Sequence, residues 1–393
     1  MLDTPTRPDT TAPAAAVALA DLETPALLLD LGRFDRNVAR LRAHLAPLGV
    51  TLRPHVKTAK SIDLARRLFP QGGGAITVST LAEAEYFADG GITDITYAVG
   101  LSPDRIARAR ALVARGVALD VLIDSVEQAR ALADAAADGA AMPGVLIEID
   151  CDGHRGGLLP GDRAIVAIAD VLAAGGVALR GVLTHAGESY NARGGVGLPE
   201  MAEAERAAAV AAAGLLRAGG HACPVVSVGS TPTAHFARDL TGVTEVRAGV
   251  FMFFDLVMHG IGVCAVDDIA VSVLATVIGH RVDKGWILTD AGWMAMSRDR
   301  GTAKHPVDQG YGLVCALDGT PYPDLIVGDA SQEHGILTVR PGSGATLPDL
   351  PVGTRVRVLP NHACATSAQH DRYHVLDAAG TGVAAVLPRI RGW

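Results

Sequence analysis

Short apolar runs alternate with helix-like segments over most of the chain, and this alternation constrains the fold more than any other feature. The runs are rich in Val and Ile, and the segments between them, such as 80–89 and 125–136, combine helical spacing with good helix formers. Eight strands that alternate with helices over about 200 residues predict a closed (β/α)8 barrel. An open doubly wound sheet is the alternative, but no GxGxxG motif follows the first run. The runs cover residues 52–56, 75–79, 94–99, 119–124, 145–150, 179–185, 225–229 and 245–250.

The pattern changes after residue 254, where strand-like segments follow one another with few helices between them. Turns rich in Gly, Pro and Asp separate segments 269–280, 286–289, 335–339 and 355–359. A chain of 393 residues is also long enough for two domains. We therefore expect an α/β barrel domain at 24–260 and a mostly-β domain at 261–393, with residues 1–23 as a candidate extra strand of the second domain.

Charge and composition argue against several classes of partner. The net charge is −8, so the chain has no basic face for phosphate backbones and we expect no nucleic-acid partner. No apolar run approaches the length of a membrane span. The first 20 residues lack the features of a secretory signal, and we expect a cytoplasmic protein with a loose N-terminus. The five cysteines are widely scattered, which argues against a disulfide framework.

The stretch LRPHVKTAKS at residues 52–61 carries the candidate reactive residue. An apolar run ends there near Arg53 and then presents Lys57, with Lys60 one short turn later. A lysine at the mouth of a buried strand loses solvation, so part of its amine is neutral and can form a Schiff base with an aldehyde cofactor. The alternative is a surface lysine on a solvated turn, which is the usual place for lysine. We predict Lys57 as the catalytic residue.

Small residues follow the last two barrel strands, where (β/α)8 barrels commonly bind phosphate. The loops after strands seven and eight contain GST and AGV, and small residues there leave backbone N–H groups free to face an anion. Ordinary tight turns are the alternative for either motif alone. A phosphate site opposite a strand-end lysine indicates pyridoxal phosphate, a phosphorylated aldehyde, as the cofactor. The candidate cofactor contacts are Gly229, Ser230, Thr231, Gly249 and Val250, together with Thr80 at the end of strand two.

Four further residues near strand ends have candidate roles around that cofactor. Arg155 could reach its phenolic oxygen, and Arg247 could face its ring nitrogen, where a fixed cation would weaken the ring as an electron sink. His185 and Tyr190 lie close together in the sequence and could stack on the ring or relay a proton. Salt bridges at the barrel rim and a structural histidine are the alternatives.

The motif PNHACAT at residues 360–366 carries a candidate metal site in the second domain. His362 and Cys364 follow the apolar strand RVRVLP, and on an extended chain the spacing i, i+2 places both side chains on one face. An imidazole and a thiolate are suitable ligands for zinc or another borderline metal. Two ligands are fewer than zinc usually has, and a buried histidine beside a packed thiol is the alternative.

Sequence blocks distributed along the chain resemble one family of enzymes. They are LRPHVKT, ITVSTLAEAE, EIDCDGHRGG, GVLTHAGESY, PVVSVGSTPT, EVRAGVFMFFDLVM, DAGWMAMSRDRGTA, QEHGIL and LPNHACAT. Together they resemble the fold-type III pyridoxal-phosphate enzymes of the D-serine dehydratase and D-threonine aldolase family. The resemblance implies an alanine-racemase-like barrel with a C-terminal β domain, Lys57 as the Schiff-base lysine, and His362 and Cys364 as metal ligands. It also implies a homodimer whose active site lies between the barrel of one subunit and the β domain of the other.

One position within the metal motif separates two activities in this family. The aldolase members usually have an aspartate where this chain has Cys364, whereas the dehydratase members have the HxC form. The resemblance therefore implies a dehydratase that uses pyridoxal 5'-phosphate and a divalent metal, zinc or else Mn, Mg or Co, on D-3-hydroxy amino acids. D-threo-3-hydroxyaspartate would give oxaloacetate and ammonia, and D-serine would give pyruvate and ammonia. The alternatives are an aldolase that yields glycine and an aldehyde, and a non-catalytic carrier of the cofactor, which would lack the second domain.

Overall fold

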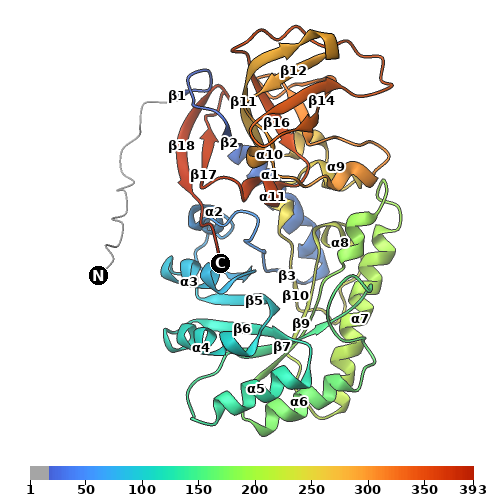
Figure 1. Ribbon diagram of the computed structural model, residues 1–393. Helices are drawn as coiled ribbons and strands as arrows, with labels where there is room; N and C mark the ends of the chain where they lie inside the picture. The colour runs from blue at the N-terminus through green and yellow to red at the C-terminus, as the bar shows by residue number, and fades with distance from the viewer. Residues whose placement is uncertain (1–16) are drawn as a thin grey trace, which may run out of the picture.

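The computed structural model describes residues 17–393, which form two sheets with their helices (Figure 1). The parallel sheet and the long helix α7 (Leu198–Ala218) occupy the lower half of the view, and the strands of the second sheet occupy the upper half. The N-terminal segment that we expected to be loose lies, up to residue 16, outside the described residues. Within residues 17–393, no helix has the length and apolar character needed to cross a bilayer.

The first sheet contains eight parallel strands, and each of the eight predicted runs overlaps one of them. Neighbouring strands in the sheet are consecutive in the chain, except that the first strand, β3, pairs with the last, β10. The ladder is interrupted between β3 and β4. Such an arrangement puts the carboxyl ends of all strands on one side, where polar loops can meet. The strands are β3 (Thr51–Leu52), β4 (Ala75–Val78), β5 (Asp94–Gly100), β6 (Ala118–Ile123), β7 (Gly144–Ile149), β8 (Leu179–Thr184), β9 (Val225–Val228) and β10 (Glu245–Val246).

The sheet curls until its two outer strands approach each other. An isolated parallel bridge pairs His55, just after β3, with Thr77 in β4. The N–H of Val56 donates to the carbonyl of Thr77 at 2.9 Å across the same gap. Strands β3 and β10 are shorter than the predicted runs 52–56 and 245–250. Past the end of β3 the chain still follows its neighbour, since the N–H of His55 donates to Ala248 O at 2.7 Å.

Helices return the chain from one strand of the curled sheet to the next. Several of them begin where a polar residue directly after a strand accepts a backbone N–H: Thr80 accepts from Glu83, and Ser125 accepts from Gln128. Some polar strand ends in the sequence are therefore helix caps. The helices of this half are α1 (Leu31–Leu45), α2 (Ile62–Arg67), α3 (Leu81–Asp89), α4 (Ile106–Ala114), α5 (Val126–Ala136), α6 (Ala164–Ala174), α7 and α8 (Thr231–Phe236), with 3-10 turns η1 (Ala46–Leu48), η2 (Pro103–Arg105), η3 (Gly187–Asn191) and η4 (Val250–Met252).

The second sheet contains ten strands in the order β1-β18-β17-β2-β11-β12-β15-β14-β13-β16, and β11 also pairs with β16. Its strands are β1 (Val17–Ala18), β2 (Ala26–Leu29), β11 (Val271–Arg281), β12 (Trp286–Thr289), β13 (Gly312–Cys315), β14 (Pro321–Ala330), β15 (Gly335–Val339), β16 (Arg355–Pro360), β17 (Arg372–Leu376) and β18 (Gly382–Pro388). The connecting helices are α9 (Leu256–Gly260), α10 (Trp293–Met296) and α11 (Ala363–Ser367), with η5 (Val266–Asp268), η6 (Val282–Lys284) and η7 (Gly301–Lys304).

The second sheet differs from the sequence prediction in two respects. The four predicted segments correspond to β11, β12, β15 and β16, whereas β13, β14, β17 and β18 were missed. Strand β1 lies within residues 1–23, the candidate extra strand, and it pairs with β18 as expected. Strand β2, which we had placed in the first domain, pairs with β11 and β17 of this sheet. A first domain that begins at residue 24 would place β2 with the curled sheet. The four buried residues of β2 instead complete the ten-stranded sheet.

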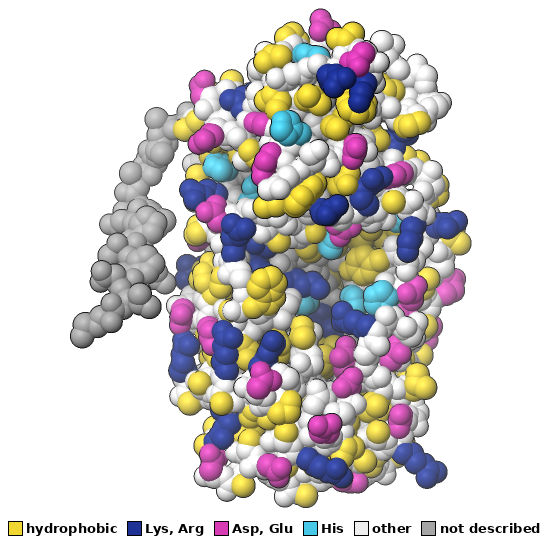
Figure 2. All heavy atoms as spheres, in the orientation of Figure 1, with side chains coloured by type: hydrophobic (Ala, Val, Ile, Leu, Met, Phe, Trp, Pro, Cys, Tyr) yellow, Lys and Arg dark blue, Asp and Glu magenta, His cyan; other side chains and the backbone are white. Residues whose placement is uncertain are grey.

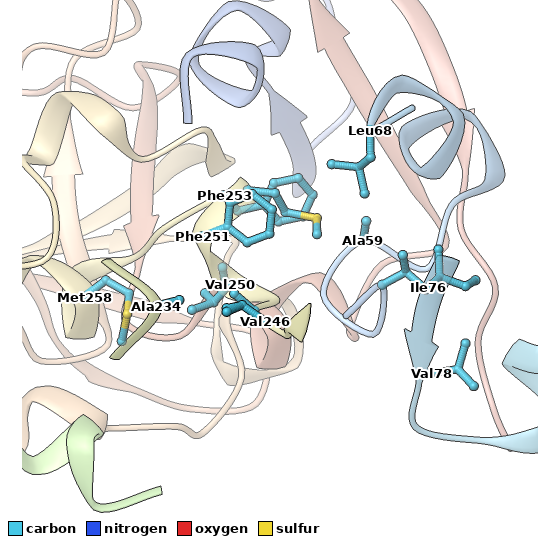
Figure 3. Close-up of a cluster of buried hydrophobic side chains, with 14 of the residues drawn as sticks. Ala59, Leu68, Ile76, Val78, Ala234, Val246, Val250, Phe251, Phe253 and Met258 are labelled. Atoms are coloured by element: carbon cyan, nitrogen blue, oxygen red, sulfur yellow. The ribbon is translucent and has the colours of Figure 1, made fainter. Parts of the chain in front are cut away.

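One apolar core continues from the curled sheet into the second sheet. Phe253 lies at the junction, with its ring centroid 6.1 Å from that of Phe34 in α1 and 5.6 Å from that of Tyr373 in β17. Figure 3 shows Phe251, Phe253 and Val250 beside the loop that contains Ala59. Burial of such large rings stabilises the junction, because each removes a large apolar surface from water. The two halves are therefore held in a fixed relation around the residues that follow β3 and β10.

Candidate active site

A cavity of about 440 Å³ lies between the two halves, at the carboxyl ends of the parallel strands. Figure 2 shows the hollow on the visible face, with Lys, Arg and His side chains around it. All but one of the predicted site residues line this cavity. They are Lys57, Arg155, His185, Tyr190, Gly229, Ser230, Thr231, Arg247, Gly249, Val250, His362 and Cys364. The exception is Thr80, which caps α3 and is bonded to Glu83.

Lys57 lies on the loop after β3 and is exposed to the cavity. Protein atoms surround the cavity on most sides, so loss of solvation lowers the pKa of the Lys57 amine, and the positive charges of Arg155 and Arg247 lower it further. Lys60 has a different environment, because its Nζ lies 3.0 Å from Oε1 of the buried Glu83. The structure thus separates the two lysines of the motif: Lys57 faces the cavity and Lys60 is held in an ion pair.

The second sheet fixes the loop that carries Lys57. The hydroxyl of Tyr373 in β17 donates to the carbonyl of Ala59 at 2.7 Å, and the N–H of Ile390 donates to Lys60 O at 2.9 Å. Both contacts join residues more than 300 positions apart in the sequence. The position of Lys57 therefore depends on the second sheet as well as on its own strand.

Two arginines place positive charge in the cavity, in different ways. Arg247 follows β10 and is buried; its Nε donates to Ser227 Oγ at 3.1 Å, and its guanidinium also bonds the carbonyl of Thr184. Burial lowers the pKa of Arg247 to about 10, although the carboxylates of nearby Glu residues oppose this effect. Arg155 is about half exposed, and its nearest charged partner is Glu148, with 3.8 Å between Nη2 and Oε1. Arg155 is therefore free to reorient toward a ligand, and Arg247 is fixed.

His185 follows β8 and is held as a neutral imidazole. Burial lowers its pKa to about 3, and the charges of Arg155 and Lys57 act in the same direction. Its Nδ1 lies 2.8 Å from the carbonyl of Gly229, which can only accept, so Nδ1 carries the proton. The ring of Tyr190 lies 6.1 Å away at an angle of 43°. These two rings form one wall of the cavity, and neither is charged.

The loops after β9 and β10 have the features of an anion site. Gly229 has φ = +146°, and a Cβ there would lie 1.8 Å from the carbonyl oxygen of Arg247, so only glycine fits. The Oγ1 of Thr231 and the Oγ of Ser79 are buried without a hydrogen-bond partner among the described residues. Within residues 17–393, no hydrogen bond uses the backbone N–H of Gly249 or Val250. Buried donors without partners are costly, and an anion in the cavity could satisfy them.

His362 and Cys364 lie on the opposite wall, where each shifts the pKa of the other. Burial opposes both charges, but the Cys364 thiolate and a hydrogen bond to Asp299 raise the pKa of His362 well above its usual value. The His362 charge in turn lowers the pKa of the Cys364 thiol despite burial. His362 Nδ1 lies 2.6 Å from Asp299 Oδ2, and Cys364 Sγ lies 3.2 Å from Thr58 Oγ1. Because Nδ1 is bonded to a carboxylate, Nε2 is the nitrogen left to bind a metal.

The local geometry of this pair differs from our expectation of two residues on one extended strand. His362 is extended, with φ = −133° and ψ = 108°, but it is the N-cap of α11, and Cys364 lies inside the first turn of that helix. Both side chains reach the cavity because the chain turns between them. Across residues 17–393, no group of three or more His, Cys, Asp or Glu side chains is placed to hold a metal ion. The protein offers two donors, which fits a metal that takes its other ligands from water or substrate.

Two acidic residues of the cavity were missed by the sequence analysis. Asp299 orients His362, as described above. Asp255 is buried and caps α9, with Oδ1 accepting from Met258 N at 2.9 Å and Oδ2 accepting from Ala363 N at 2.9 Å. Asp255 therefore ties the end of the curled-sheet half to the metal motif. An aspartate before an apolar helical stretch signals a cap, but its contact with residue 363 has no signal in the sequence.

The fold and the cavity together define an alanine-racemase-like enzyme, and comparison with known families agrees. Residues 29–257 match the family described as "Alanine racemase, N-terminal domain", and residues 270–376 match "Putative serine dehydratase domain". The chain belongs to this family of alanine-racemase-like D-amino-acid enzymes, which confirms the resemblance noted in the sequence. Its relatives are dehydratases and aldolases, which are lyases.

Three relatives describe its place within the family. D-threo-3-hydroxyaspartate dehydratase of Delftia sp. is 52% identical, over 95% of this chain and 99% of that protein. A solved structure of that enzyme has a TM-score of 0.92 at 51% identity, covering 96% of this chain and 100% of the other. D-serine dehydratase of Dictyostelium discoideum is 28% identical, over 91% of this chain and 94% of that protein. The D-threonine aldolase structure from Filomicrobium marinum has a TM-score of 0.78 at 26% identity, covering 96% of this chain and 98% of the other.

Proposed function

We propose that the protein is a dehydratase of D-3-hydroxy amino acids that uses pyridoxal 5'-phosphate and a divalent metal. The observation that carries this proposal is a single cavity with a desolvated lysine on one wall and an imidazole–thiolate pair on the other. The first wall suits an aldehyde cofactor and proton transfer, and the second suits a metal ion. D-threo-3-hydroxyaspartate is the substrate we favour, because the relative of that name shares half of its residues over nearly the whole chain.

The cavity fits pyridoxal phosphate at both ends of the molecule. When bound, this cofactor supplies an aldehyde that condenses with amines and a ring that draws electrons from the α-carbon. Lys57 would hold the aldehyde end, and the Gly229–Thr231 loop with Gly249 and Val250 would hold the phosphate. Arg247 would lie toward the ring nitrogen and Arg155 toward the phenolic oxygen. The partnerless hydroxyl of Thr231 and the close approach of backbone at Gly229 are the features that support this fit.

The opposite wall fits a divalent metal. His362 and Cys364 would hold it, and their nitrogen and sulfur donors suit zinc. Mn, Mg or Co could also bind these two side chains, with oxygen ligands in the remaining positions. When bound, the metal supplies a Lewis acid for the β-hydroxyl of the substrate. Asp299 would orient His362 by its hydrogen bond of 2.6 Å.

The residues of the chain then have separate tasks in the reaction. Lys57 would accept the α-proton, and loss of solvation favours this role because it lowers the pKa of the amine. It approaches from one face only, so an α-hydrogen of the opposite configuration is out of its reach. His185 and Tyr190 wall the cavity without adding charge. Arg247 would keep the ring nitrogen of a bound cofactor unprotonated, which would favour loss of the hydroxyl together with the proton.

Two alternatives remain, and products distinguish them. A D-threonine aldolase shares the fold at 26% identity, and the same walls could support cleavage between Cα and Cβ. The thiolate at position 364 favours dehydration by resemblance, since the aldolases usually have aspartate there. A non-catalytic carrier of the cofactor would have no use for a second wall with a metal-binding pair, and the continuous cavity argues against it.

The test is an analysis of products from the purified holoprotein. D-threo-3-hydroxyaspartate should give oxaloacetate and ammonia, D-serine should give pyruvate and ammonia more slowly, and L-serine should not react. Glycine and an aldehyde as the main products would show that the aldolase alternative holds. Absence of turnover with every 3-hydroxy amino acid, in protein that binds the cofactor, would favour the carrier.

We further propose that the curled sheet is a closed (β/α)8 barrel within a cofactor-binding domain at 24–260, apart from β2, which pairs with the second sheet, and that 261–393 form the metal-binding domain. The bridge between His55 and Thr77 supports closure. The family resemblance supports a homodimer in which a second subunit completes the cavity, and a sedimentation experiment that finds a fully active monomer would contradict it. The cytoplasmic location stays a prediction from the sequence.

A further inference from the structure

A buried carboxylate lies behind the candidate phosphate loop and does not line the cavity. Glu205 is on α7, and only 2% of it is exposed. Its Oε1 accepts the backbone N–H groups of Ala186 and Gly229, each at 2.9 Å, and its Oε2 accepts the hydroxyl of Thr233 at 2.7 Å. Ala186 and Gly229 lie on the loops that follow two neighbouring strands, β8 and β9, and Thr233 lies in the first turn of α8. One side chain thus connects both loops to the long helix behind them.

These contacts fix residues that do face the cavity. Ala186 follows His185, whose Nδ1 donates to Gly229 O at 2.8 Å, so both polar groups of the Gly229 backbone are engaged. Thr233 accepts the N–H of Ser230 at 3.1 Å. The loop from Gly229 to Thr231 is therefore held from behind, and the Thr231 hydroxyl is left without a partner.

A loop held in this way is preorganised for an anion. Gly229 has a left-handed φ of +146°, a conformation that a free glycine adopts only part of the time. The hydrogen bond from its N–H to the buried Glu205 side chain is strengthened because water is excluded there. Preorganisation of this kind raises affinity by removing the cost of ordering the loop when the ligand binds.

We propose that Glu205 is a positioning residue for the anion-binding loop, and that it sets the affinity for the phosphate group of the cofactor without touching it. The inference rests on the proposed function, since it takes a phosphorylated aldehyde as the ligand. A carboxyl group does not attract a phosphate, so Glu205 acts through the geometry of Gly229 and Ser230. Burial raises the pKa of Glu205, and the hydrogen bonds from Thr233, Gly229 and Ala186, together with the charge of Arg247, oppose this effect.

The chain offers variants that separate geometry from charge. Glu205→Gln keeps the length of the side chain: its oxygen can accept both N–H groups, and its amide can donate to Thr233 Oγ1. Glu205→Asp keeps the charge but is one methylene shorter, so it cannot reach all three donors. Glu203→Gln is the control on the same helix, because Glu203 is half exposed and pairs only with Arg206 at 2.6 Å and 2.7 Å.

The experiment measures dissociation constants of the apoprotein for pyridoxal phosphate and for pyridoxal, which lacks the phosphate. The ratio of the two constants isolates the contribution of the phosphate group, and thermal unfolding of each apoprotein checks that the variant is folded. Glu205→Asp should weaken binding of pyridoxal phosphate at least tenfold while binding of pyridoxal changes less than threefold. Glu205→Gln and Glu203→Gln should keep the wild-type ratio.

Two results would overturn the proposal. The first is a folded Glu205→Asp protein with the wild-type ratio, and the second is an equal loss of affinity for both ligands, which a purely structural role would produce. Failure of the proposed function would give a different result. Wild-type protein would then bind pyridoxal phosphate no more tightly than pyridoxal, and there would be no phosphate site for Glu205 to position.

Discussion

The curled parallel sheet and the ten-stranded sheet both reach the cavity, but they bring side chains of opposite character to it. The loops of the parallel sheet contribute cations, with Lys57, Arg155 and Arg247, and backbone donors without partners. The ten-stranded half contributes Asp299 and the thiolate of Cys364. One wall is suited to an anion and the other to a metal cation.

The histidines of the two walls are in opposite states for the same reason. His185 lies beside Lys57 and the arginines, and burial among positive charges keeps it neutral. His362 lies beside Asp299 and Cys364, which hold a proton on it in the metal-free protein despite burial. Two histidines thus differ in pKa because their neighbours differ, so the environment of each wall, more than the residue type, decides its chemistry. It also means that the two walls can be disabled separately.

The largest effect should come from the cation wall. Lys57→Ala should lower kcat/KM on the order of 10³-fold or more, because the residue proposed to hold the cofactor is also the proposed base. Borohydride treatment of the wild-type holoprotein should attach the cofactor to Lys57, and peptide mapping would show the site. The lysine in the ion pair with Glu83 is the internal control, and a label on Lys60 would show that the wrong lysine had been assigned.

A smaller loss, about 100-fold, is expected from the metal wall. His362→Ala, Cys364→Ala or a chelator should abolish most dehydration while cofactor affinity changes less than about threefold, since the anion loops lie on the other sheet. Cys315→Ala, which removes a buried thiol of the same sheet away from the cavity, is the matched control. Full turnover by metal-free protein would contradict the Lewis-acid role and the division into two walls.

The smallest effect concerns stability, and it tests the neutral histidines of the parallel-sheet half. Burial lowers the pKa of His235 in α8 to about 4, so below pH 6.5 the unfolded chain binds a proton that the folded protein does not. The stability that comes from keeping His235 neutral is fully present above pH 6.5. As the pH falls to 4, the free energy of unfolding decreases by about 1.4 kcal/mol for each pH unit. Between pH 7 and pH 5, His235→Asn should therefore lose about 2 kcal/mol less unfolding free energy than wild type in urea titrations. Equal losses in both proteins would show that His235 is protonated in the fold.

The sequence predicted those parts of the molecule that depend on near neighbours in the chain. The runs of the parallel sheet are continuous and apolar because both of their faces are covered, and helix caps such as Ser125 follow them directly. Strands β13 and β17 were missed because they are short and one carries a charged residue. Pairing with β14 and β16 makes β13 a strand, and pairing with β18 and β2 does the same for β17. The extended geometry predicted for His362 and Cys364 was wrong for a related reason: the contact of Asp255 with Ala363 starts a helix there.

The sequence by itself determined the alternation of strands and helices, the reactive motif with Lys57, and the pairing of His362 with Cys364. Only the tertiary structure decided which lysine of the motif is free, which carboxylates support the site, and which histidines are charged. The physical reason is that periodicity and capping act over a few residues, whereas solvation and charge depend on groups brought together from distant parts of the chain. Asp299 and Glu205 are the clearest cases, because each acts through partners that no local pattern indicates.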